Sequence, residues 1–127
     1  MLPHITRLMN LTEDEIKNHP KLLVNAFDHE HRILFWNAHC ETFFGIKEQN
    51  ALGKKLEDLV PNARHSNKMI YLEKALSGES VYIDNDKYEK GNGYYTQIVL
   101  PLKNNRGEVV AAVNIVRNLP TPEPFPI

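Results

Sequence analysis

The sequence predicts an α+β domain in which one five-stranded antiparallel sheet carries short helices and one longer helix on one face. Three observations lead to this fold class. The chain has 127 residues, a length that fits a single domain, and 42% of them are hydrophobic, enough to build a core. Two strand-like runs precede a series of helical patterns, and three strand-like runs follow it. Such an order closes one sheet if the first hairpin lies beside the last strand.

The first 20 residues predict a helical extension ahead of the domain. Thr12 and Glu15 have the spacing of a capping box, in which each side chain bonds the other residue's backbone N–H. The helix that begins there should end before Pro20, because a residue that precedes proline avoids the α conformation. This extension is expected to pack on the domain or on a second copy.

A hairpin follows, with strands at 22–27 and 32–36 joined by a polar turn at 28–31. Simple alternation places Ile33 and Phe35 on one face of the second strand and Leu34 and Trp36 on the other. We expect the first pair to face the core. Leu34 and Trp36 would then contact the N-terminal helix or a second subunit in a dimer.

The middle of the chain predicts several short helices and one longer one. Asn37 is a suitable N-cap for a helix at 38–44, and Gly45 a suitable terminator. Shorter helical turns are predicted at 47–52 and 54–59. The longest predicted helix spans 62–76, where Met69, Leu72 and Leu76 form an apolar stripe.

Three further strands are predicted at 80–84, 94–102 and 109–116. The last two are joined by the turn at 104–107. Pro101 lies inside the second of these strands, which favours an edge position or a bulge because proline cannot donate a backbone hydrogen bond. Residues 119–127 contain four prolines and predict an extended tail.

Charge and cysteine content exclude several classes of protein. The formal net charge is −1, with 15 basic and 16 acidic residues and no long block of one sign, so neither nucleic acid nor an anionic membrane is an expected partner. No apolar run approaches the roughly 20 residues of a membrane-spanning helix. Cys40 is the only cysteine and cannot form an internal disulfide, which favours a cytoplasmic location.

Several short motifs, in this order and spacing, resemble those of the PAS domain family of bacterial sensor proteins. They cover residues 21–118, most of the chain. The motifs are Asp28 with Arg32-Ile33, Asn37-Ala38, Phe44-Gly45, Leu52-Gly53-Lys54, Leu59-Val60-Pro61, Ala75 to Glu79, Leu100-Pro101-Leu102 with Arg106 to Val110, and Arg117-Asn118. The chain departs from the family pattern at His31, where glycine is usual, and at Asn118 and Pro120, which replace an aspartate and a threonine.

The resemblance implies a non-catalytic sensory domain for signal transduction. Such a domain binds a small ligand in its core or mediates dimerisation and contact with an output domain or protein. A homodimer is therefore expected. In this fold the ligand cavity would lie between the sheet and the middle helices. The candidate lining residues are Ile33, Phe35, Met69, Leu72, Tyr94, Gln97, Ile98, Val113, Asn114 and Ile115.

Two other functions stay open, and the cofactor is not identified. A small α+β enzyme with an internal cavity would need a buried histidine or carboxylate with a shifted pKa, but the sequence offers no ordered catalytic residues. A haem-based gas or redox sensor would use His65 as the candidate iron ligand, and this is the less favoured alternative. A flavin–cysteinyl adduct is not expected, because residues 61–66 contain no cysteine. The histidines of the 28–31 turn predict no metal site.

Overall fold

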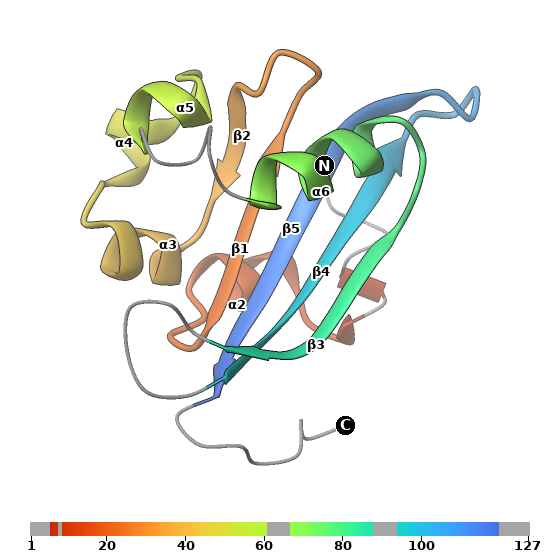
Figure 1. Ribbon diagram of the computed structural model, residues 1–127. Coiled ribbons are helices and arrows are strands. Elements are labelled where there is room, and N and C mark those ends of the chain that lie inside the picture. The colour runs from red at the N-terminus through yellow and green to blue at the C-terminus, as the bar shows by residue number, and fades with distance from the viewer. Residues whose placement is uncertain (1–5, 8, 61–66, 88–93, 120–127) are drawn as a thin grey trace.

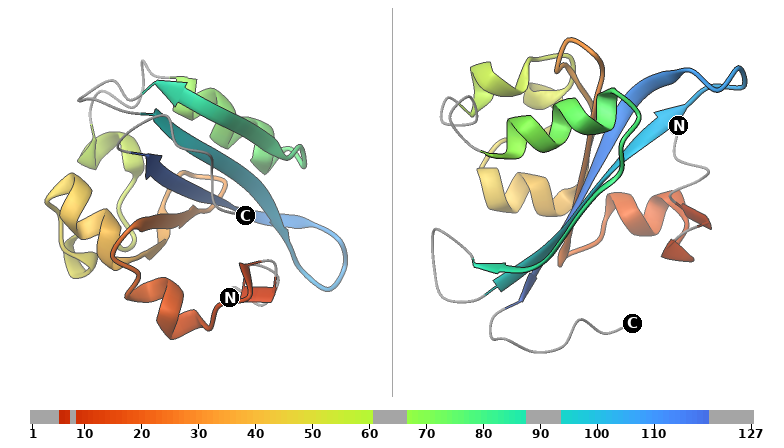
Figure 2. Two further views of the ribbon diagram at one scale, coloured as in Figure 1. Left: turned by 90° about the horizontal axis from the view of Figure 1, so that it is seen from below. Right: turned by 45° about the vertical axis from the view of Figure 1, so that its right-hand side comes forward.

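The computed structural model describes residues 6–7, 9–60, 67–87 and 94–119. One sheet forms its centre, with helices α3 to α6 on one face and the N-terminal helix α2 on the other (Figures 1 and 2). The strands are β1 (Leu22–Phe27), β2 (Ile33–Trp36), β3 (Val81–Lys87), β4 (Tyr94–Lys103) and β5 (Val109–Leu119). They lie in the order β2-β1-β5-β4-β3, and every neighbouring pair is antiparallel. The predicted fold class is confirmed.

Four of the helices begin and end close to the predicted residues, and the longest one ends as predicted. Residues 62–66, at the predicted start of that helix, lie outside the described part of the chain. The helices are α2 (Glu13–Lys17), α3 (Ala38–Phe44), α4 (Glu48–Ala51), α5 (Leu56–Leu59) and α6 (Asn67–Leu76). The capping box of Thr12 and Glu15 is formed in both directions. Asn37 caps α3, and Gly45 ends it in the left-handed conformation with φ of 69°. Within the described residues, no helix is both long and apolar enough to cross a membrane.

Two hydrophobic layers enclose the sheet. The inner layer lies between the sheet and the helices, and it includes Ile33, Trp36, Cys40 and Leu72. The outer layer lies between the sheet and the N-terminal segment, with Ile16 of α2 fully buried in it. Both faces of the central strands are therefore apolar, which explains why all six residues of β1 are buried.

The predicted faces of Phe35 and Trp36 are wrong, because a β-bulge interrupts the alternation of β2. Phe27 pairs with Ile33 and Ala26 with Phe35, so Leu34 is an extra residue in its strand. Ile33 and Trp36 consequently share the inner face, whereas Leu34 and Phe35 belong to the outer layer.

Trp36 is thus covered by neither the N-terminal helix nor a second subunit. Its side chain is 1% exposed and its ring lies 5.1 Å from that of Phe44 on α3. The indole Nε1 donates to the carbonyl of Ile46, at 2.9 Å. Trp36 therefore holds the segment after α3 against the sheet.

Pro101 lies in β4 where the strand has a partner on one side. β4 pairs with β5 along its length, including Pro101 with Ala112. Its pairing with β3 ends at Val99. The strand is internal in the sheet but locally an edge at the proline, which is how the missing N–H is tolerated.

Candidate ligand site on the inner face of the sheet

A ladder of three amide side chains crosses the inner face of the sheet. Asn25 of β1 lies directly opposite Asn114 of β5, and Gln97 comes from β4 on the far side of β5. Gln97 Nε2 donates to Asn114 Oδ1 at 2.7 Å, and Asn114 Nδ2 donates to Asn25 Oδ1 at 3.0 Å. Strand alternation sets all three on the face that the helices cover. The ladder joins three strands by side chains as well as by the backbone.

Cys40 on α3 lies at the Asn25 end of this ladder. Its Sγ donates to the backbone carbonyl of Val24 at 3.3 Å. Burial raises the pKa of the Cys40 thiol to about 12, and hydrogen bonds with Asn37, Val24 and the Asn25 side chain only partly oppose this shift. The thiol therefore stays protonated at neutral pH and packs as a small apolar group, as a buried cysteine commonly does.

The other end of the ladder is a buried acceptor without a partner. Gln97 is 2% exposed, and its Oε1 accepts no hydrogen bond from any described residue. The neighbours of Gln97 along the same face of β4 are Tyr95 and Val99, both members of the inner layer. A buried acceptor left unpaired costs about 1–3 kcal/mol. This oxygen is a place where a hydrogen-bond donor would be stabilised.

The candidate lining residues do not all lie on one face. Ile33 and Leu72 are buried in the inner layer, Met69 packs against it, and Gln97 and Asn114 form the ladder. Four others lie on the opposite face, so their assignment to the same cavity is wrong: Phe35, Ile98, Val113 and Ile115. The side chain of Tyr94 lies outside the described part.

The reason for this error is the period of a strand. Val113 and Ile115 flank Asn114, so they must point to the face opposite to it. Apolar composition cannot reveal which face is which, because helices cover one face and the N-terminal segment the other. Asn25 was not predicted as part of a site. The signal for it was a single amide inside the apolar run of β1.

Among the described residues, the histidines considered as metal or haem ligands do not form a shared site. His65 lies outside the described part of the chain. His29 Nε2 contacts the carbonyl of Val109 at 2.7 Å, whereas the His31 ring contacts Glu57 and Glu73. No group of three or more His, Cys, Asp or Glu side chains within the described ranges is arranged to hold a metal ion.

A separate shallow hollow lies on the surface of α6. Its lining comes from one side of that helix and its end: Met69, Ile70, Glu73, Lys74 and Ser77. Ile70 is largely exposed there, whereas Leu72 and Ala75 point into the core. The hollow therefore lies outside the helix layer and does not reach the amide ladder.

Comparison with known proteins gives a family and a set of related folds. A family model described as the PAS fold matches residues 19–120. The PAS domain of the histidine kinase ThkA has 20% identity and a TM-score of 0.63, covering 76% of this chain and 98% of that one. The PAS domain of BvgS from Bordetella pertussis has 20% identity and a TM-score of 0.65, covering 91% and 87%.

A third solved structure agrees with these two. The sensory box sensor histidine kinase from Vibrio cholerae has 15% identity and a TM-score of 0.64, covering 91% of this chain and 94% of that one. No match was found among curated proteins. At these identities the structural neighbours show the fold, and the family model shows the family.

Proposed function

Because the chain belongs to the PAS fold family, we propose that it is a non-catalytic sensory domain that binds a small molecule against the ladder of Asn25, Asn114 and Gln97. PAS domains are sensory modules of signalling proteins, and the structural neighbours come from histidine kinases. The binding of a small molecule and its place in the core are our proposal.

One observation carries this proposal, the unpaired Oε1 of Gln97. Gln97 and Asn114 donate through their nitrogens, and Asn114 and Asn25 accept through their oxygens, but the Gln97 oxygen has no donor among the described residues. The ligand should therefore present an N–H or O–H group to Gln97. The buried polar residues of the described part are Asn25, Asn37, Thr96 and Gln97. None of these is basic, so a neutral donor suits the site better than an anion.

The chemical nature of the ladder residues argues against the enzyme alternative. General acid–base catalysis needs a side chain that gains or loses a proton near neutral pH. The ladder consists of amides, which do not titrate, and the nearby Cys40 thiol is held protonated. Binding and release of a ligand is the chemistry that these groups support.

The remaining parts of the proposal concern organisation. We propose a domain over 21–118, a helical extension over 1–20 and a proline-rich tail over 119–127. The output would come from a partner protein or another domain, with homodimerisation as a route for the signal. Leu34 packs against the outer layer, as do Met9 and Leu11 of the extension, and it is the proposed contact for the extension. A cytoplasmic location is part of the same proposal.

A fragment experiment tests the binding site. Two sets of small fragments, neutral N–H or O–H donors (phenols, amides and indoles) and matched carboxylates, are added to ¹⁵N-labelled protein. We expect the donors to shift the side-chain amide signals of Gln97 and Asn114 and the carboxylates to leave them unchanged. The Gln97→Leu variant keeps a similar volume but removes the acceptor, so donors should no longer bind to it.

Gln49→Leu is the matched control, because Gln49 is an exposed residue of α4 and the substitution is identical. Donor fragments should bind this variant as they bind the wild type. The proposal is wrong if donors bind the Gln97→Leu variant equally well, or if no fragment of either set perturbs the ladder.

A further inference from the structure

His31 occupies a backbone conformation that its residue type rarely adopts. It ends the turn between β1 and β2 with φ of 67°, in the left-handed region that favours glycine. Asp28 stabilises this turn by accepting hydrogen bonds from the backbone N–H groups of Glu30 and Arg32, each at 2.9 Å. A histidine here thus carries a backbone cost that its side-chain contacts must offset.

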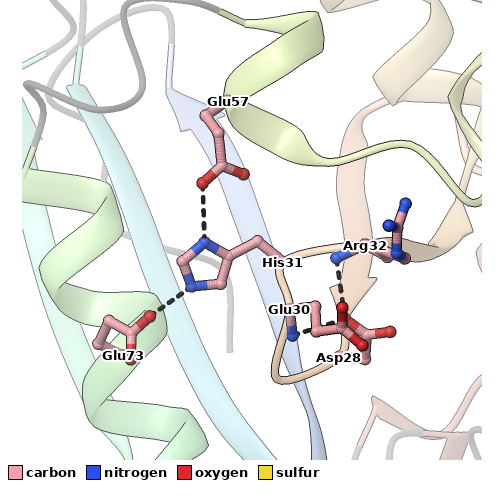
Figure 3. Close-up of polar contacts among 6 residues, drawn as sticks. All are labelled: Asp28, Glu30, His31, Arg32, Glu57 and Glu73. Carbon is pink, nitrogen blue, oxygen red and sulfur yellow. Dashed lines mark hydrogen bonds and ion pairs between the residues drawn. The ribbon is translucent and has the colours of Figure 1, made fainter.

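The His31 ring lies between two carboxylates on two different helices (Figure 3). Its Nδ1 is 3.1 Å from Glu57 Oε2 on α5, and its Nε2 contacts Glu73 Oε1 on α6. These partners are 26 and 42 residues away along the chain. One imidazole therefore connects the hairpin to both helices.

The two contacts require a protonated ring. A carboxylate only accepts hydrogen bonds, and a neutral imidazole has one N–H donor and one acceptor nitrogen. Only the imidazolium form can donate to Glu57 and Glu73 at once. If the ring lost its proton, one nitrogen lone pair would face a carboxylate oxygen, and that contact would become repulsive.

We propose that His31 is a proton-sensing clasp, which links α6 to the β1–β2 hairpin when it is protonated and breaks this link when it is neutral. The function is independent of the proposed ligand, because the clasp lies at the turn and not at the amide ladder. The clasp responds to pH, and its response is the formation or loss of the contact between His31 and Glu73 of α6.

The electrostatics of the three residues agree with this proposal. Burial lowers the pKa of His31, but the hydrogen bonds and charges of Glu57 and Glu73 together outweigh burial and raise the pKa above the ordinary value for histidine. For Glu57, burial raises the pKa, and hydrogen bonds with the backbone and with His31 outweigh it, so the net shift is downward. Both shifts favour the ion pair.

Exposure decides which contact is lost on deprotonation. The Glu73 side chain is 60% exposed, so water can solvate its carboxylate when the ring no longer donates. The Glu57 side chain is 16% exposed, and its Oε1 has no hydrogen-bond partner among the described residues. A neutral ring should therefore keep its N–H on Glu57 and give up Glu73.

Backbone contacts hold α5 to the hairpin whatever the state of the ring. Leu56 N donates to His31 O at 3.0 Å, and Ile33 N donates to Lys54 O at 2.9 Å. Among the described residues, α6 has one polar contact with this turn, that of Glu73 with the His31 ring. Deprotonation thus breaks the polar link between α6 and the turn and leaves α5 in place, while Leu72 and Ala75 keep α6 packed on the core. The other titratable or charged side chains described on these elements are Asp28, His29, Glu30 and Arg32 of the turn, Lys54, Lys55 and Asp58 around α5, and Tyr71 and Lys74 of α6.

An NMR pH titration of the intact chain tests the clasp. The ring signals of His31 and the amide protection factors of α6 are followed in the wild type, in Glu73→Gln, in His31→Asn and in the control His29→Asn. Asparagine tolerates the left-handed conformation, so His31→Asn should fold. His29 lies in the same turn and contacts neither glutamate.

In the wild type and in His29→Asn, we expect His31 to titrate above the model-peptide value of about 6.5. The protection of α6 should fall over the same pH interval. Glu73→Gln should lower the His31 pKa, and His31→Asn should remove the pH dependence of α6. The proposal is overturned if His31 titrates at or below the peptide value, if Glu73→Gln leaves its pKa unchanged, or if α6 protection does not follow the ring.

Discussion

Replacing Asn37 with alanine should be among the most destabilising single changes in this protein. The buried side chain makes four hydrogen bonds. Its Oδ1 accepts from Val24 N at 3.1 Å and from Cys40 N at 3.2 Å. Its Nδ2 donates to the carbonyls of Ile16 at 2.9 Å and Leu22 at 2.6 Å. One amide thus joins α2, β1 and α3.

The expected magnitude follows from these four bonds. Loss of the N-cap at Cys40 costs about 1 kcal/mol. The Ile16 carbonyl keeps the backbone N–H of His19 as a second donor, at 3.3 Å. Val24 N and Leu22 O would be left unpaired, at about 1–3 kcal/mol each. A total of about 3–7 kcal/mol is expected, a large part of the roughly 5–15 kcal/mol that stabilises a typical domain.

Urea unfolding at pH 7 measures this loss. The matched control is Asn50→Ala, because Asn50 is an exposed residue of α4. This control should change the free energy of unfolding by less than about 0.5 kcal/mol. A free energy of unfolding for Asn37→Ala within about 1 kcal/mol of the wild type, with an unchanged urea dependence, would show that these four bonds contribute little.

Three further outcomes follow from buried or bridging side chains. Trp36→Phe removes the donor to Ile46 O and should cost about 1–3 kcal/mol in urea unfolding, so an unchanged stability would contradict the position of the indole. Cys40 should react with iodoacetamide in urea but not in the native protein at pH 8, since burial holds its pKa near 12; rapid native labelling would disprove this. His19 Nδ1 accepts from the backbone N–H of Leu22, and its pKa is lowered, chiefly by burial. Its contribution to stability should therefore be complete above about pH 6.5 and disappear as the pH falls through the lower folded pKa. Unfolding of His19→Gln between pH 7 and 5 should show a weaker acid dependence than the wild type, and an equal dependence would count against this role.

Local chemistry was enough to predict the order of the elements. Asn37 and Gly45 mark the two ends of α3, and the capping box of Thr12 and Glu15 marks the start of α2. These signals depend on backbone groups within a few residues, so the sequence contains all the information that they need. The sheet order then followed from the requirement that the hairpin join the last strand.

The faces of the strands could not be predicted in the same way. Leu34 is the extra residue of a bulge, and one inserted residue exchanges the faces of everything beyond it on that strand. An apolar residue such as Val113 gives no warning, because the outer face is covered as fully as the inner one. The polar residues were the better guide, since a buried amide must find partners on its own face.

The His31 clasp was missed for another reason. The turn at 28–31 has the composition of a solvated loop, and sequence alone assigns such residues to the surface. The partners Glu57 and Glu73 come from helices whose approach is decided by the packing of the whole inner layer. Only the replacement of the usual glycine by His31 in the family pattern marked the position as unusual.

A high-resolution crystal structure of the protein as purified would show whether the amide ladder holds a ligand. We expect electron density for a small molecule in the core, with a donor atom about 2.7–3.2 Å from Gln97 Oε1. Ligand binding at the ladder is ruled out if protein side chains fill the space around Gln97 and one of them donates to that oxygen.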